Sequence, residues 1–363
     1  MKYVDEYRDK ALIKKLVALI KRAASRSYTF MEVCGGHTAA IHRFGIPSLL
    51  PDNVRLLSGP GCPVCVTNNS FIDKAIAYSK MKDVIITTFG DLIRIPGSSS
   101  SLEKEKARGA DIRIVFSGLE ALEIAKSGSD KKVIFLGIGF ETTAPGTAVT
   151  IKEAADAGIE NFYVLSAHKV MPPAMDIIIK EGIALDGFIC PGHVAAITGS
   201  SAFSFIPDKY RLGCVITGFE PVDLLQAIYM LINQVNNDSP RTEIQYSRAV
   251  TRQGNVIAQR LMDEIFMHSD EQWRGFGVIP ASGLILREEY KNYDAESMIP
   301  LPLNVNAYEE HVLCICGEIL RGLKIPPDCR LFAGTCIPEN PVGACMVSNE
   351  GACNTYYKYR LNE

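Results

Sequence analysis

The stretch VIFLGIGFETTAPG, Val133–Gly146, decides the class of fold. It starts with an unbroken apolar run, Val133–Ile138, passes through glycines, and leads into a helix-like segment, Gly146–Ala157. A strand that is apolar on both faces is typical of a parallel sheet covered by helices on both sides. This stretch therefore predicts one strand–turn–helix unit of an α/β protein.

The same alternation of apolar strands and helix-like segments extends to both sides of this unit. The candidate strands are Phe30–Val33, Val54–Leu57, Val84–Thr88, Ile112–Val115, Val133–Ile138, Phe162–Leu165, Gly187–Ile189 and Cys214–Ile216. The candidate helices include Ser70–Lys80, Gly118–Lys126, Gly146–Ala157, Ala174–Glu181 and Pro221–Gln234. Strands that alternate with helices of about 10–15 residues indicate parallel sheets. The sequence thus predicts an α/β architecture.

Some of these units resemble one another. The similar pairs are Cys34-Gly-Gly-His37-Thr-Ala-Ala-Ile41 with Cys190-Pro-Gly-His193-Val-Ala-Ala-Ile197, Val84–Gly97 with Val133–Gly146, and Leu57-Ser58 with Leu165-Ser166. Their order differs between the two halves, so a tandem repeat does not explain them. Unless the similarity is due to chance, we expect two similar Rossmann-like parallel-sheet domains that face each other, with the glycine-rich strand ends around a shared cleft.

The pattern divides the chain into four parts. An apolar stripe at helical spacing predicts that residues 1–28 hold a helix docked on the body; a membrane-surface helix is less favoured because the stripe has no large aromatic residue. The α/β domains are expected at residues 29–116 and 117–238. Beyond them the alternation fades, and residues 239–363 are expected to form a loop-rich, cysteine-rich domain.

Composition limits the class of function. Of 363 residues, 47% are hydrophobic and 22% charged, and the net charge is −3, which is not the charge of a typical nucleic-acid-binding protein. The apolar runs are far shorter than the roughly 20 residues that span a bilayer. Residues 1–25 lack the apolar core of a signal peptide. We therefore expect a cytoplasmic protein, whose thiols are metal ligands or redox groups rather than structural disulfides.

The cysteines are concentrated near the C-terminus. Six of the eleven follow the spacing C-x-C-x12-C-x6-C-x8-C-x7-C from Cys314 to Cys353, among prolines and glycines. Such a segment has little apolar material, and metal binding would supply free energy of folding. Thiolates suit zinc and iron–sulfur clusters alike, and the spacing does not separate the two. Either site normally uses four thiols, which leaves two for a disulfide or dithiol.

Cys34 follows a candidate strand and precedes Gly35, Gly36 and His37. The glycines let backbone approach a ligand closely, and a neighbouring histidine can lower the pKa of a thiol. The alternative is a buried cysteine at the end of a strand. The pattern favours a functional thiol at Cys34 with His37 beside it.

Cys62 and Cys65 form a C-P-V-C step after Ser58-Gly-Pro-Gly61. Two thiols at this spacing can close a disulfide or chelate a soft metal, and structural packing is the alternative. The prolines and glycines predict a rigid, exposed loop at the start of a helix.

Further polar residues follow other candidate strands. His193 and His168 could donate protons or line the cleft, although ordinary loop histidines would look the same. Glu141-Thr142-Thr143 could bind an anion or nucleotide, but the third glycine of G-x-G-x-x-G is missing. Helix capping by Thr142 or Thr143, with Pro145 in the first turn, also explains this segment.

Taken together, several of these motifs resemble one family. They are Cys34-Gly-Gly-His-Thr38, Gly59-Pro-Gly-Cys-Pro-Val-Cys65, Gly139-Phe-Glu-Thr-Thr-Ala-Pro145, Pro191-Gly-His-Val-Ala-Ala-Ile197 and Pro338-Glu-Asn-Pro-Val-Gly-Ala-Cys-Met-Val-Ser-Asn-Glu-Gly-Ala-Cys353. In this order, from about Thr29 to the C-terminus, the chain is similar to HypD, a family of [NiFe]-hydrogenase maturation factors. The resemblance implies two α/β domains and a C-terminal domain with a [4Fe-4S] cluster.

The resemblance also implies partners and a task. Family members form a complex with the small chaperone HypC, on which the hydrogenase iron receives two cyanides and one carbon monoxide. HypE delivers the cyanide, which it obtains as a carbamoyl group from HypF. The implied function is a redox-active scaffold that assembles the Fe(CN)2CO moiety and takes part in cyanide transfer.

Residue by residue, the resemblance implies these roles. Cys34 would hold the iron together with a cysteine of HypC, and Cys62 and Cys65 would be the dithiol of the cleft. His37 and His193 are catalytic candidates from their own motifs. The cluster ligands would be Cys314, Cys329, Cys336 and Cys353, and the redox pair Cys316 and Cys345. Electrons would then pass from the cluster through Cys316 and Cys345 to Cys62 and Cys65, and on to iron at Cys34.

Two other classes of function remain open at this point. An iron–sulfur-dependent thiol–disulfide reductase would reduce generic disulfides without a chaperone. A structural zinc protein would be colourless, whereas a protein with an iron–sulfur cluster is brown.

Overall fold

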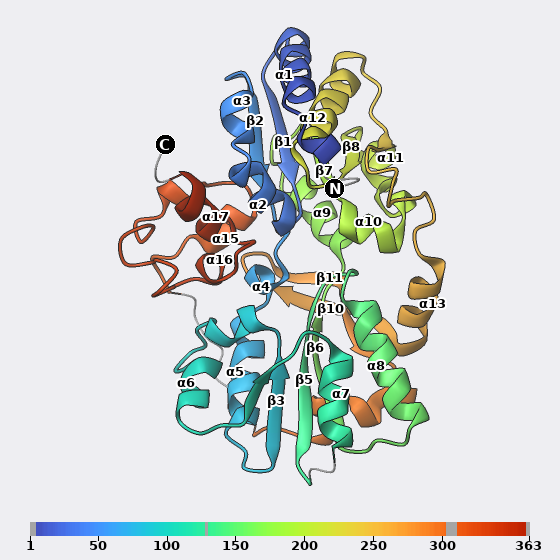
Figure 1. The fold of residues 1–363 in the computed structure, drawn as a ribbon, viewed down its shortest axis with the longest axis vertical. Helices are drawn as coiled ribbons and strands as arrows, with labels where there is room; N and C mark the ends of the chain where they lie inside the picture. The colour runs from blue at the N-terminus through green and yellow to red at the C-terminus, as the bar shows by residue number, and fades with distance from the viewer. Residues whose placement is uncertain (1–4, 128–129, 303–310, 361–363) are drawn as a thin grey trace.

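The computed structural model describes residues 5–127, 130–302 and 311–360, which form two parallel sheets, a two-stranded hairpin and a short-helix C-terminal region (Figure 1). The five-stranded sheet has the order β2 (Val54–Ser58), β1 (Tyr28–Glu32), β7 (Gly187–Pro191), β8 (Gly213–Thr217) and β9 (Thr242–Ile244). The four-stranded sheet has the order β4 (Ile112–Ile114), β3 (Val84–Thr88), β5 (Lys132–Gly139) and β6 (Phe162–His168). The hairpin pairs β10 (Phe266–Trp273) with β11 (Gly277–Leu286).

The helices of the described residues are mostly short. Those of the body are η1 (Asp5–Arg8), α1 (Lys10–Ala23), α2 (Gly35–Arg43), α3 (Ile46–Leu49), α4 (Pro63–Val66), α5 (Asn69–Ser79), η2 (Gly90–Arg94), α6 (Leu102–Ala107), α7 (Gly118–Lys126), α8 (Ala144–Asp156), α9 (Met171–Lys180), α10 (Gly192–Thr198), η3 (Ser200–Phe203), α11 (Phe205–Tyr210), α12 (Pro221–Asn236), α13 (Val256–Ile265), η4 (Glu288–Tyr293) and α14 (Ala295–Met298). The C-terminal region adds α15 (Cys316–Leu320), η5 (Pro326–Asp328), α16 (Ala344–Val347) and α17 (Ala352–Arg360). The α/β class is confirmed, and all strands of both large sheets run parallel.

The chain passes from the first sheet to the second and back. β1 and β2 start the five-stranded sheet, the segment from β3 to β6 builds the four-stranded one, and β7 then returns to pair with β1. The sheets therefore do not follow the expected division at residues 29–116 and 117–238, since β3 and β4 lie with β5 and β6. Strand pairing joins residues far apart in the sequence, so the alternation of strands and helices does not reveal which strands are neighbours.

This topology explains the internal similarity. The two Cys-x-Gly-His segments follow β1 and β7, which are neighbours in one sheet, and the two similar apolar stretches contain β3 and β5, which are neighbours in the other. These two pairs thus each lie within one sheet, whereas the third pair is divided: Leu57-Ser58 lies in β2 of the five-stranded sheet and Leu165-Ser166 in β6 of the four-stranded one. The order of the pieces differs because the second sheet is inserted between β2 and β7.

Both sheets are covered on both faces, as the apolar strands predict. Every residue of β3, β7 and β8 is buried. On the first sheet, alternate residues enter two different cores: Phe188 and Ile216 lie in one apolar cluster, and Ile189 and Val215 in another. At about 25 cal/mol per Å² of apolar surface, such burial is the main favourable term in folding.

The N-terminal helix packs on the body. Asp9 caps α1 by accepting the backbone N–H of Leu12, and the buried Leu16 and Ile20 belong to the same cluster as the apolar face of α12. Arg8 also pairs with Glu220 at the start of α12 at 2.8 Å. The apolar stripe is therefore covered by protein.

Residues 239–302 differ from the loop-rich region that the sequence predicts. β9 extends the first sheet, and the β10–β11 hairpin lies in the middle of the molecule, near the end of β6 (Figure 1). Bridges join Lys169 to Gly283 and Thr67 to Trp273. Short helices and loops make up residues 287–302 and the described residues from 311 on, where α17 packs on α2 and α16 on α4. No helix of the described residues is long and apolar enough to cross a membrane.

Candidate functional site

A cavity of about 440 Å³ lies where segments from both sheets and the C-terminal region meet. Its wall is formed by the ends of β1, β5 and β7, the loop before α4, the start of α10, and Glu350, which lies two residues before α17. The lining residues are Val33, Cys34, Gly61, Pro63, Phe140, Thr142, Thr143, Pro191, His193, Val194, Ala196, Ile197 and Glu350. Strand ends of an open parallel sheet are where such proteins bind ligands.

Cys34 supplies the thiol of this cavity. It lies two residues beyond β1, at the N-cap position of α2, and its backbone N–H donates to Glu32 Oε2 at 2.9 Å. Gly61 packs directly behind it: a Cβ there would lie 2.2 Å from the backbone nitrogen of Cys34, so no larger residue fits. Backbone geometry thus fixes where the sulfur points.

The pKa of Cys34 is raised to about 12, chiefly by burial and then by the charge of Glu350. The backbone N–H groups of His37 and Gly36 oppose this shift without cancelling it. The expected lowering by the His37 ring does not occur. Burial lowers the pKa of His37 itself to about 4, so its ring carries no charge at neutral pH.

His37 is fully buried and lies outside the cavity wall. Its Nε2 donates to the carbonyl oxygens of Gly218 at 3.1 Å and Thr217 at 3.3 Å, which assigns the proton to that nitrogen. Its ring stacks on Phe219 at 4.6 Å. His37 therefore ties α2 to the end of β8.

His193 occupies the opposite position. It is exposed at the cavity wall, and its ring stacks on the same Phe219 at 3.9 Å. Phe219 thus lies against both histidines, and a Cβ on Gly36 would approach its ring to 3.1 Å. Nothing in the local sequence marks Phe219, which lies outside the motifs quoted above.

Cys62 and Cys65 are buried, which corrects the expectation of an exposed loop. Only 3% of Cys62 and none of Cys65 is accessible. Cys62 caps α4, and its Sγ accepts the backbone N–H of Cys65 at 3.2 Å. They are covered because α16 packs on α4: Cys65 Sγ lies 3.9 Å from the carbonyl oxygen of Ala344. Burial, with Cys62 adjacent, raises the pKa of Cys65.

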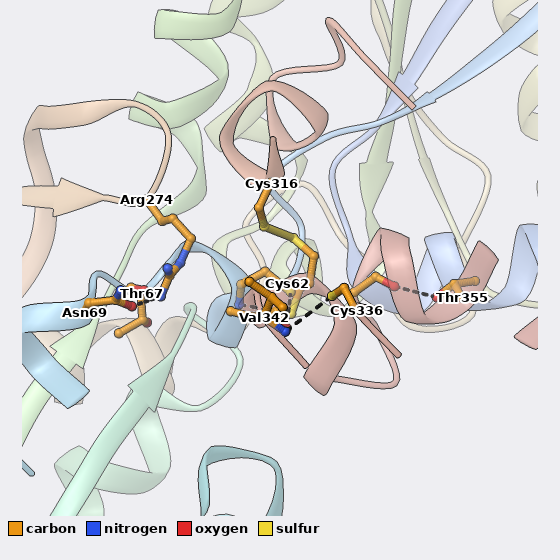
Figure 2. Close-up of a disulfide and its surroundings, with 12 residues drawn as sticks. Cys62, Thr67, Asn69, Arg274, Cys316, Cys336, Val342 and Thr355 are labelled. Atoms are coloured by element: carbon orange, nitrogen blue, oxygen red, sulfur yellow. Dashed lines mark hydrogen bonds between the residues drawn. A yellow bond between two sulfur atoms is a disulfide. The ribbon is translucent and has the colours of Figure 1, made fainter. Parts of the chain in front are cut away.

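The six C-terminal cysteines come together in the structure. Cys316 and Cys345 form a disulfide, with Cα atoms 6.4 Å apart, close to Cys62 in Figure 2. The other four lie with this disulfide around one small pocket: Cys314, Cys329, Cys336 and Cys353. Burial raises the pKa of Cys353, and the three other thiols add to the shift.

Four thiols on one pocket are the donor set that an iron–sulfur cluster uses, so these residues fit one. Within the part of the chain that the structure describes, no three His, Cys, Asp or Glu side chains are placed to hold a single metal ion. The sulfur of Cys336 accepts the backbone N–H of Val342 at 3.3 Å (Figure 2).

Beside the disulfide, a buried arginine holds the loop after α4. Arg274 donates to the backbone oxygen of Thr67 at 2.9 Å and to Asn69 Oδ1 (Figure 2). Its charge opposes the rise in the pKa of Cys65. Arg274 comes from the turn of the central hairpin, so it links that hairpin to the dithiol segment.

The Glu141-Thr142-Thr143 segment is divided by the fold. Thr142 and Thr143 line the cavity, whereas Glu141 is buried and accepts the backbone N–H of Met171 at 3.0 Å. Thr143 is the N-cap residue of α8, yet its hydroxyl donates to the carbonyl oxygens of Ile138 and Phe140 instead of capping the helix. The capping explanation is therefore wrong, while proline does stand in the first turn.

His168 does not reach the cavity. It ends β6, is fully buried, and contacts the hydroxyl of Thr147 through Nε2 at 3.2 Å. Of the histidines considered, only His193 lies in the wall. Glu350, which does line it, was missed because its position between two cysteines of the tail gave no separate signal.

The chain is similar to known proteins over almost its whole length. The family model "HypD: Hydrogenase formation hypA family" matches residues 11–360. A "Hydrogenase maturation factor HypD2" of Bradyrhizobium diazoefficiens is 46% identical over 370 residues, covering 99% of this chain and 97% of its own. The "Hydrogenase maturation factor HypD" of Escherichia coli is 42% identical over 373 residues, covering 100% of this chain and 99% of its own. A "Putative hydrogenase expression/formation protein" of Methanocaldococcus jannaschii is 45% identical over 354 residues, covering 97% and 98%.

Proposed function

This chain belongs to the HypD family of hydrogenase maturation factors, and we propose that it is a redox-active scaffold on which, together with the small chaperone HypC, the Fe(CN)2CO moiety of a [NiFe]-hydrogenase is assembled. The observation that carries the proposal is the cavity in which the Cys34 thiol, the His193 ring and the Glu350 carboxylate share one wall. The iron is the cargo of this cavity, and HypE, supplied by HypF, is the proposed donor of cyanide.

Cys34 is proposed to bind the iron as a thiolate, with a second thiolate from HypC. Soft donors suit iron that carries cyanide and carbonyl ligands. Because the site holds Cys34 protonated when no cation is present, binding of Fe²⁺ displaces the thiol proton. His193 and Glu350 are the groups on this wall that can accept that proton or hydrogen-bond an incoming ligand.

The two cysteine pairs are proposed to exchange electrons. When Cys316 and Cys345 are reduced and Cys62 and Cys65 form a disulfide, attack by one thiolate and resolution by the second transfers two electrons and two protons to Cys62 and Cys65. The contact of Cys65 with Ala344, the residue before Cys345, supports this exchange. The four remaining C-terminal thiols, Cys314, Cys329, Cys336 and Cys353, would hold a [4Fe-4S] cluster, which supplies one-electron reducing equivalents when bound.

The burial of Cys62 and Cys65 favours this scaffold over a general thiol–disulfide reductase. A reductase of protein disulfides needs an accessible attacking thiol, and both sulfurs here lie beneath α16. The exchange that their position allows is internal.

The test is anaerobic co-purification of the chain with HypC, followed by infrared spectroscopy for cyanide and carbonyl stretching bands. The proposal expects a brown complex that retains iron and shows both kinds of band. In a Cys62→Ala, Cys65→Ala double variant the visible spectrum should persist while the bands of added ligands are lost. A colourless protein that contains zinc would contradict the proposed cluster. Bands of added ligands that persist in the double variant would contradict the proposed exchange of electrons.

A further inference from the structure

A third pair of cysteines lies in the core of the first sheet. Cys190 on β7 and Cys214 on β8 are both fully buried, and their sulfur atoms lie 2.7 Å apart. Non-bonded heavy atoms pack at roughly 3.5–4.0 Å, and a disulfide bond measures about 2.05 Å. The two sulfurs are thus closer than a packing contact allows, and a small movement would join them.

Strand register explains why these side chains meet. Phe188 lies opposite Cys214, and Cys190 lies opposite Ile216, so the two cysteines are diagonal neighbours on adjacent parallel strands. Residues two apart on a strand share a face. All four side chains accordingly belong to one apolar cluster, while the alternate residues Ile189 and Val215 belong to another.

We propose that Cys190 and Cys214 are a redox-active dithiol that closes to a cross-strand disulfide on oxidation by a peroxide. One thiol attacks the peroxide and becomes a sulfenic acid, with release of one water from hydrogen peroxide. The second thiol then displaces hydroxyl from that sulfur, which forms the S–S bond and releases a second water. Two electrons pass from the dithiol to the peroxide, and the atoms balance.

The surroundings set the rate of this oxidation. Burial, and then the adjacent Cys214, raises the pKa of Cys190, so the thiol is protonated at neutral pH. Thiolate is the reactive form. The pair should therefore react more slowly than an exposed thiol, and once one sulfur is oxidised, its partner is already in place to resolve it before further oxygen is added.

The position of the pair connects it with the cavity. β7 leads through Pro191 to His193, and β8 leads through Thr217 to Phe219, whose ring stacks on His193 at 3.9 Å. A bond between the strands would fix the spacing of the two ends that hold this ring pair. This consequence does not depend on iron, so the inference stands or fails apart from the proposed function.

Peptide mapping of the full-length protein, purified under reducing, anaerobic conditions, tests the inference. Trypsin cleaves after Lys180, Lys209, Arg211 and Arg241, which gives peptides 181–209 and 212–241 with one cysteine each. After exposure to hydrogen peroxide, denaturation and alkylation, we expect the two peptides to be linked, lighter than their sum by two hydrogen atoms. Dithiothreitol should release both.

A Cys214→Ala variant is the matched control. It should yield no linked species, and Cys190 should instead carry sulfinic or sulfonic acid after the same treatment. The main measurement uses the unaltered chain, so a folding defect of the variant does not affect it. Two results from the unaltered chain would overturn the inference. One is recovery of the two peptides unlinked, each alkylated at its cysteine. The other is oxidation of Cys190 to an oxygen-containing acid without formation of the link.

Discussion

The segments Cys34–His37 and Cys190–His193 share the pattern Cys-x-Gly-His, yet each sends a different side chain into the cavity. In the first, the cysteine lines the cavity and the histidine is buried; in the second, the cysteine is buried and the histidine lines the cavity. Both segments follow neighbouring strands of one sheet and begin a helix. Similar sequence and similar location have therefore produced opposite exposures.

The difference comes from where each strand ends. β1 ends at Glu32, two residues before its cysteine, whereas β7 continues through Cys190 to Pro191. Cys190 thus keeps the strand alternation and faces the core, while Cys34 lies in the turn. α2 starts at the residue after Cys34, but α10 starts two residues after Cys190. A shift of one or two residues in these boundaries decides which group meets a ligand.

Replacing each of the two cysteines in turn is expected to give the largest difference between the segments. Cys34→Ser should abolish iron retention in the proposed complex with HypC, because a hydroxyl is a much poorer ligand for soft iron than a thiolate. Cys190→Ser should retain iron, since its sulfur faces Cys214 and not the cavity. Iron content per complex, measured after anaerobic purification, distinguishes the two. Equal retention by both variants would show that the cavity thiol is not the ligand.

The glycines of the two segments should also differ. In Gly192→Ala the new Cβ would lie 2.3 Å from the backbone oxygen of Thr217, and backbone there cannot move without distorting β8. We expect a loss of about 2–4 kcal/mol in unfolding free energy. In Gly36→Ala the new Cβ meets no backbone atom: its nearest neighbours are the Phe219 ring at 3.1 Å and the Cys34 sulfur at 3.7 Å. Because the ring can shift and alanine favours the helix by about 1 kcal/mol, that variant should be close to neutral.

Chemical denaturation of the two alanine variants measures this difference. The comparison would lose its basis if Gly36→Ala were the more destabilised of the pair, since that would place the tighter backbone contact at the first segment.

Much of the fold follows from the sequence, and the limits are physical. The strand from Val133 was predicted because it is apolar on both faces, and the similarity of the two Cys-x-Gly-His segments pointed to related units. Which sheet each strand joins could not be predicted, because β1 pairs with β7 across more than a hundred residues of intervening chain, and no local pattern records that choice.

The same limit applies to the site. Cys34 and His193 were predicted from glycines and strand ends, and both line the cavity. The burial of Cys62 and Cys65 could not be predicted, because it depends on α16, which is nearly 280 residues away in the sequence. Glu350 reaches the cavity for a similar reason: it comes from the C-terminal region, whose docking place only tertiary contacts decide.

The histidines allow a smaller test of the comparison. His37→Gln should lower unfolding free energy by about 1–2 kcal/mol, because glutamine keeps an N–H donor for the backbone oxygens of Thr217 and Gly218 but lacks the buried ring that stacks on Phe219 at 4.6 Å. His193→Gln, at an exposed position, should change it by less than about 0.5 kcal/mol. Denaturation curves give both values, and ligand addition to iron should fall only with His193→Gln once the folded fractions are matched. If His193→Gln were the less stable variant, His193 rather than His37 would be the buried histidine, contrary to the structure.

The smallest effect concerns the second sheet, where the histidine at a strand end is closed off from the cavity. Burial lowers the pKa of His168 to about 3 from an ordinary value of 6.5, and the neighbouring Lys169, paired with Glu271, opposes a second positive charge. Between pH 6.5 and about pH 3 the His168 imidazole binds a proton in the unfolded chain but stays neutral in the folded chain. Stability from this residue is therefore complete above pH 6.5 and is lost as the pH falls towards 3.

Each unit by which the pH falls within that window lowers the free energy of unfolding by about 1.4 kcal/mol for one such histidine. Between pH 6.5 and pH 5.5 the unaltered chain should thus lose about 1 kcal/mol more stability than His168→Gln, whose side chain does not titrate. Urea denaturation at both pH values, with His193→Gln as the exposed control, measures the difference. An equal pH dependence in His168→Gln and the unaltered chain would mean that water reaches the end of β6, and that the hairpin residue Phe266, whose ring lies 5.7 Å from His168, does not seal it.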